Sequence, residues 1–129
     1  MNAVELSKRL QLFAIRIINM AETLPNTASG NAIRNQIVRS GTSPGANYRA
    51  ACLAKSKKDF INKLKIVEEE LDETVYWVEI ILLLELIKQN LLDDLYNEAK
   101  ALFAIISRSI KTIKQNEKIN QSLNKSVNP

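Results

Sequence analysis

The side chains with the most potential for chemistry are carboxylates that cluster between positions 68 and 73. Glu69 lies one helical turn from both Asp72 and Glu73, so two acids can share one face of a helix. Some helical bundles bind iron with such inward carboxylates, but those sites also use a histidine. The chain contains no histidine. We therefore interpret these acids as surface or interface charges and expect no metal site.

The other reactive side chains lack the partners that would activate them. Without histidine, Ser40 and Ser43 have no imidazole to act as a general base. Cys52, the single cysteine, lies in a run of small apolar residues and is interpreted as a packed thiol. The chain has neither a glycine-rich phosphate loop nor a nucleophile elbow. The sequence thus predicts a protein that is not an enzyme and holds no cofactor.

Basic residues supply the strongest candidate for binding. The net charge is +4, but residues 1–58 carry +7, residues 59–99 carry −8 and residues 100–129 carry +5. Lysines and arginines that share one face neutralise phosphates and release counterions, which gives salt-sensitive, sequence-tolerant binding to nucleic acid. A solvated charged face is the alternative interpretation, since no helix-turn-helix, zinc finger or aromatic RNA-binding motif accompanies the charge. The candidate phosphate contacts are Arg34, Arg39, Arg49, Lys55, Lys57, Lys58, Arg108, Lys111 and Lys114.

Apolar residues recur every three or four positions along four segments, which predicts four helices and no strand. Short connections between long helices favour an all-α, antiparallel up-down-up-down four-helix bundle over residues 1–114. The polar, Asn-rich segment 115–129 is expected to be a flexible, frayed tail. The predicted helices run from Leu6 to Leu24 before Pro25, from Gly30 to Leu53, from a Ser56 cap to about Gln89, and from Leu92 to Ile113.

Small and polar residues occupy what should be the core face of the second helix. The track that begins at Ile33 continues through Ser40, Pro44 and Asn47, with Ser43 beside it. Proline and glycine are poor choices for a helix interior, so the helix either kinks here or divides in two. We interpret the segment as structural: small side chains let helices approach closely, and Asn47 satisfies carbonyls that Pro44 leaves free.

The third helix carries more apolar residues than one contact face needs. This wide arc indicates either a deeply buried helix or a contact between subunits, and both interpretations stay open. The candidate interface residues are Tyr76, Trp77, Ile80, Leu83 and Leu84.

The run from Arg39 to Ala51, RSGTSPGANYRAA, resembles the signature of the bacterial "four helix bundle protein" family. Members of that family are also described as encoded by intervening sequences within large-subunit ribosomal RNA genes. Further matches are Leu24-Pro25, the run KSKKDF from Lys55 and the run EELDETVYW from Glu69, so the resemblance covers roughly residues 8–114.

The resemblance implies an up-and-down four-helix bundle that assembles into a ring, typically a homopentamer. Related proteins are accessory factors of diversity-generating retroelements, in which a basic pentamer binds nucleic acid and associates with a reverse transcriptase. We therefore expect an oligomeric, non-enzymatic protein that binds structured RNA or DNA through basic helix faces. The alternative is a protein-binding scaffold with no affinity for nucleic acid. No signal peptide or membrane-spanning segment is expected, and the location is expected to be cytoplasmic.

Overall fold

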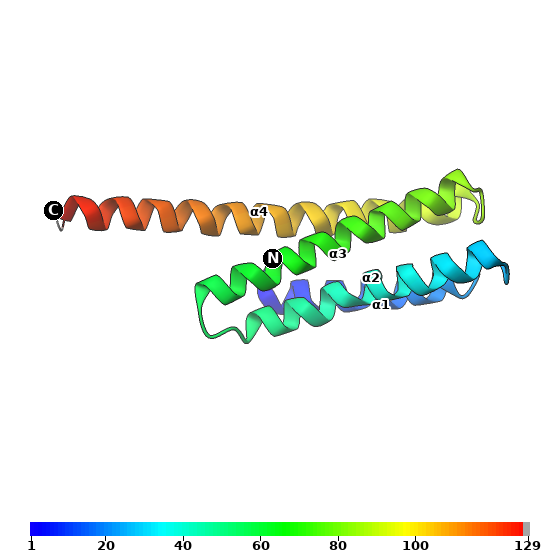
Figure 1. Ribbon diagram of the computed structural model, residues 1–129, viewed down its shortest axis with the longest axis horizontal. Helices are drawn as coiled ribbons and strands as arrows, with labels where there is room; N and C mark the ends of the chain where they lie inside the picture. The colour runs from blue at the N-terminus through cyan, green and yellow to red at the C-terminus, as the bar shows by residue number, and fades with distance from the viewer. Residues whose placement is uncertain (128–129) are drawn as a thin grey trace.

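Four α-helices run alternately up and down in the computed structural model, which describes residues 1–127 (Figure 1). Short turns connect them, and no strand occurs within the described residues. The all-α, four-helix architecture predicted from the apolar spacing is confirmed. The helices are α1 (Ala3–Ala21), α2 (Ala28–Cys52), α3 (Lys57–Leu83) and α4 (Gln89–Val127).

Each of the first three helices begins at a polar cap. The side chains of Asn2, Thr27 and Ser56 accept hydrogen bonds from backbone N–H groups three residues further on, at 2.9, 3.1 and 3.1 Å. These bonds satisfy donors that the first turn of a helix leaves without a partner. The cap predicted at Ser56 is therefore confirmed.

The core is one cluster of apolar side chains, to which each helix contributes one stripe. Phe13, Ile37, Leu71 and Leu102 are almost fully buried within it. The helices are arranged so that α2 packs between α1 and α3, while α4 packs on α3 and over a shorter stretch on α1. This order places α1 and α3 at opposite corners of the bundle.

The second helix is continuous from Ala28 to Cys52 despite the proline inside it. The division into two helices that the composition allowed is therefore wrong. Thr74 of α3 donates to the buried hydroxyl of Ser40 at 3.0 Å, and Ser40 donates to the carbonyl of Ile37. These bonds satisfy the polar groups that the sequence places in the core, so the helix stays intact through the segment.

Asn47 has a different partner from the one expected. Because Pro44 has no N–H, the carbonyl it leaves without its usual helical partner is that of Ser40. The amide of Asn47 instead donates to the carbonyl and hydroxyl of Ser43, at 3.0 and 2.8 Å. Asn47 thus stabilises the helical turn that contains Pro44 and does not replace the missing bond.

The third helix ends at Leu83, six residues before the predicted end at Gln89. Glu85 adopts a left-handed conformation with a φ of 54°. The N–H groups of Glu85 and Leu86 donate back to the carbonyls of Leu82 and Ile81, at 3.1 Å each. This is a Schellman termination without the usual glycine, and the missing glycine removes the signal by which the sequence would reveal the end of the helix.

The fourth helix continues to Val127, so the expectation that the chain frays after residue 114 is wrong for residues 115–127. The last two residues of the expected tail, 128 and 129, lie outside the described residues. This end of α4 extends beyond the start of α3 as a single helix (Figure 1). Between residues 1 and 127, no helix has the length and apolar character needed to cross a membrane.

Candidate nucleic-acid interface

Seven of the nine predicted phosphate contacts lie at one end of the bundle, which we call the basic end. It is the end where α1 begins, α2 turns into α3, and α4 passes on as a single helix (Figure 1). The chain reverses there over a short turn, so cations from α2, the turn, α3 and α4 are brought together. The seven residues are Arg49, Lys55, Lys57, Lys58, Arg108, Lys111 and Lys114, and all are exposed.

Arg34 lies at the opposite end and has a structural role. Its Nε donates to the carbonyl of Ala21 at 3.0 Å, and its Nη2 donates to the carbonyl of Leu24 at 2.5 Å. The first carbonyl belongs to the last residue of α1 and the second lies in the turn that follows, so Arg34 stabilises the turn between α1 and α2. We remove it from the candidate interface.

Arg39 lies midway along α2 and is already paired with acids. Its guanidinium forms ion pairs with Glu70, at 3.0 Å, and with Glu73 of α3. Glu73 also accepts from the indole N–H of Trp77 at 3.2 Å. Because two carboxylates neutralise it, Arg39 is a poor phosphate contact.

The seven cations of the basic end form no ion pair in the part of the chain that the structure describes, although two acids, Glu5 and Asp59, also lie at this end. The ion pairs within residues 1–127 join Arg9 to Glu98, Arg39 to Glu70 and Glu73, and Lys63 to Asp59, so none involves the seven cations. From residue 100 onwards, Glu117 is the one acid in the sequence. The opposite end carries exposed carboxylates on the α3–α4 turn and the start of α4, including Glu85, Asp93 and Asp94. The molecule is therefore polarised along its length.

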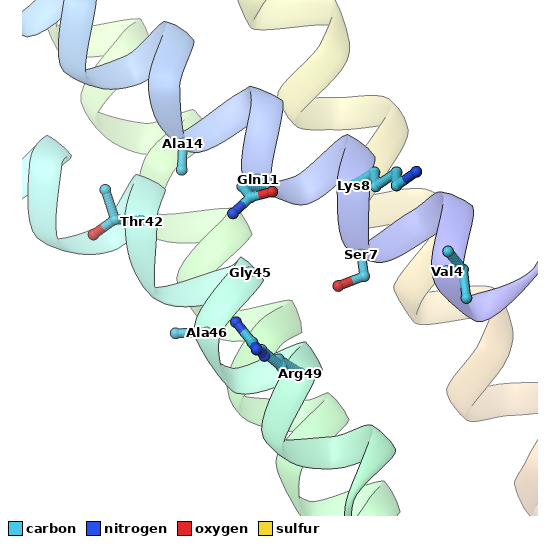
Figure 2. Close-up of a pocket in the computed structure, with 9 residues that line it drawn as sticks. All are labelled: Val4, Ser7, Lys8, Gln11, Ala14, Thr42, Gly45, Ala46 and Arg49. Atoms are coloured by element: carbon cyan, nitrogen blue, oxygen red, sulfur yellow. The ribbon is translucent and has the colours of Figure 1, made fainter.

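A groove of about 500 Å³ lies between α1 and α2 beside the basic end (Figure 2). In Figure 2, Ser7 and Gln11 are directed from α1 towards α2, and the guanidinium of Arg49 lies back along α2 near Gly45. Lys8 lies on the rim that α1 forms. None of the described residues that line the groove is acidic.

The predicted interface residues of α3 divide into two sets. Trp77 and Ile80 are half-buried and pack against the core, as the deeply buried interpretation requires. Tyr76, Leu83 and Leu84 are exposed, with Leu83 79% accessible. The ring of Tyr76 meets that of Trp77 edge-on, with centroids 5.0 Å apart. Three of the five residues are therefore free for a contact with another molecule.

The remaining candidates for chemistry have ordinary structural environments. Cys52 is exposed, so its interpretation as a packed thiol is wrong. It lies one turn from Tyr48, whose pKa rises to about 12 because burial, and then the nearby thiol, disfavours the phenolate. Among residues 1–127, no group of three or more metal-ligating side chains could hold a metal ion.

Three basic residues of this region were not among the predicted contacts. Lys8 was not predicted because the sequence of the first helix indicates only a core stripe. Its position beside the groove follows from the packing of α1 on α2, which the sequence does not show. Lys118 and Lys125 fall in the expected tail. Their spacing from Lys111, seven and fourteen residues, puts all three on one helix face and was the available signal.

The fold and the gathered cations define the class: a small all-α protein of four antiparallel helices with one basic end. A model of the 23S rRNA-intervening sequence protein family matches residues 3–108, and the chain belongs to that family. The resemblance read from residues 39–51 is thereby confirmed.

A solved relative has the same fold. It is the crystal structure of a protein of unknown function from the S23 ribosomal protein family of Bacteroides thetaiotaomicron. It is 36% identical, superposes with a TM-score of 0.79, and the match covers 86% of this chain and 99% of that one. A comparison with curated proteins finds no match.

Proposed function

We propose that this protein binds structured nucleic acid through its basic end. The observation that carries the proposal is that seven exposed lysines and arginines from three helices and a turn gather there without ion-pair partners among the described residues. Phosphates attract such cations and release counterions on binding, whereas a neutralised surface gains little. No catalytic step is part of the proposal.

The test is fluorescence anisotropy with a labelled RNA hairpin and a DNA duplex of matched length, titrated across salt. The variant Arg108→Glu/Lys111→Glu reverses two neighbouring cations of the basic end. We expect it to weaken binding more than about tenfold near 0.15 M salt, and to make the dependence of log Kd on log salt shallower by about 2. Its helical circular dichroism should stay unchanged, because both side chains are exposed.

The matched control is Lys88→Glu/Lys100→Glu, which makes the same change in net charge at exposed positions away from the basic end. Its affinity should stay within about twofold of the parent. Equal losses in the two variants would show that net charge alone governs binding. Failure of the parent protein to bind either probe at low salt would reject the proposal in favour of the protein scaffold.

We also propose that copies of the chain assemble side by side. Two exposed apolar patches support this: Leu12, Ile15 and Ile18 on α1, and Tyr76 and Leu83 on α3. Because α1 and α3 lie at opposite corners, the patches point in different directions. A contact between different patches on neighbouring copies is head-to-tail and closes into a ring when the rotation between copies allows.

Charge favours the same pairing of patches. The α1 patch carries the exposed Arg16, and the α3 patch carries the exposed Asp72 and Glu79. Both patches lie away from the basic end, so assembly through them leaves that end open. Apolar faces of this kind also favour the scaffold alternative, in which a different protein occupies them.

A further inference from the structure

We infer that the groove between α1 and α2 is a phosphate-binding subsite for the backbone of the nucleic acid held at the basic end. The inference rests on the proposed function and adds residues that it does not contain, Ser7 and Gln11. Its basis is the shape of the groove, the donors on its walls and its position.

The groove exists because the two helices diverge. A Cβ atom added at Gly41 would lie 2.7 Å from the side chain of Ile17, so α2 packs tightly on that side chain there. One turn later, a Cβ at Gly45 would lie 3.6 Å from the backbone of Leu10, so the helices are still close at this level, and they separate beyond it towards Val4 and Arg49 (Figure 2). Small side chains continue on both walls, at Ser7 and Ala46, and leave the space open.

The walls carry donors of the kind that bind phosphate. Arg49 supplies positive charge from α2, and the Gln11 amide and the Ser7 hydroxyl supply neutral donors from α1, whereas Lys8 lies on the rim with its side chain directed away from α2 (Figure 2). No side-chain hydrogen bond or ion pair within residues 1–127 occupies Lys8, Gln11 or Arg49. An anion entering the groove therefore meets donors with no competing partner.

The position of the groove matches the path of a nucleic-acid backbone. Arg49 lies near the end of α2, and the turn that follows carries Lys55. A nucleic-acid backbone bound to the lysines at this turn and at the start of α3 would continue into the groove, where its phosphates would contact the donors of the walls. The small side chains of the floor allow a chain as bulky as a sugar-phosphate backbone to approach closely.

The test gives one residue of the groove wall a negative charge in one variant and a positive charge in another. Ala46 is exposed in the groove, so Ala46→Glu and Ala46→Lys alter its charge without removing packing. Near 0.15 M salt we expect Ala46→Glu to weaken binding of the RNA hairpin about fivefold, and Ala46→Lys to strengthen it by a similar factor. Ala28→Glu and Ala28→Lys, at an exposed position of the opposite end, are the charge-matched controls and should change affinity less than twofold.

The outcomes separate this inference from the proposed function. If Arg108→Glu/Lys111→Glu weakens binding while both Ala46 variants match their controls, the groove is not a subsite and the basic end still binds. If the parent binds neither RNA nor DNA, the proposed function fails first. If Ala46→Glu instead lowers the mass of the particle in light scattering, a second copy covers the groove and the inference is overturned.

Discussion

At the scale of single residues, glycines set how closely α1 and α2 approach. Gly41 and Gly45 lie one turn apart on α2, and both face α1. The first has no room for a side chain, whereas the second has room for a methyl group. By residue type both are poor helix formers, and only their contacts with α1 distinguish their roles.

This difference predicts opposite effects of one substitution. Gly41→Ala should lower stability by about 1–2 kcal/mol, because overpacking against Ile17 outweighs the helix propensity that alanine gains. Gly45→Ala should raise stability by up to about 1 kcal/mol, because its methyl group meets only ordinary contacts. Thermal and urea unfolding of the two variants measure both values. A higher melting temperature for Gly41→Ala would contradict the tight contact.

At the scale of helices, the apolar spacing was sufficient for the number and order of the helices and for the approximate bounds of α1 and α2, and the misses have physical causes. The end of α3 was placed too late because Glu85 takes the position where glycine usually marks a helix end. The continuity of α2 was undecided because the bond between Ser40 and Thr74 joins residues far apart in sequence. Long-range contacts of this kind leave no local signature.

The candidate site was also only partly predictable from the sequence, because contacts between residues far apart in the chain decide which cations are paired. Residue type alone selected the seven cations of the basic end, because lysine and arginine gather in two stretches of the sequence, around the α2–α3 turn and between residues 108 and 114. It also selected Arg34 and Arg39, whose partners lie on other elements or across a turn. Whether a cation is free or paired is decided by the packing of helices, which the sequence does not display.

The extension of α4 predicts a separation between stability and binding. Residues 115–125 are exposed except for Glu117, so removing residues 115–129 should shift the melting temperature by no more than about 3 °C. The same truncation removes Lys118 and Lys125, and should weaken binding to the RNA hairpin several-fold. Differential scanning calorimetry and anisotropy on the same sample measure the two effects. A large drop in melting temperature would show that the extension supports the fold.

At the scale of the whole molecule, the two apolar patches and the basic end occupy different parts of the surface. The patches on α1 and α3 lie on opposite sides, and the cations lie at an end that neither patch covers. Assembly through the patches would thus bring several basic ends to one side of a ring. Several weak phosphate sites linked in this way bind one nucleic acid more tightly than any of them alone.

Disrupting one patch should therefore reduce the mass of the assembly. Ile15→Asp places a charge in the α1 patch at a position already 49% accessible, so the fold of the single chain should persist. Light scattering should then report a smaller particle with unchanged helicity. Leu53→Asp, at a 78% accessible position outside both patches, is the control and should leave the mass unchanged. Equal masses for parent and Ile15→Asp would exclude this patch from assembly.

The separation of cations and carboxylates to opposite ends also gives the chain a permanent electric dipole along its length. Helices such as α3, with 27 residues, span about 40 Å, several times the Debye length of about 8 Å in physiological salt. At low ionic strength, the field of a polyanion exerts a torque on this dipole and turns the positive pole forward before contact. Encounters would then be oriented rather than random, and this rotational steering would fade as added salt shortens the reach of the field.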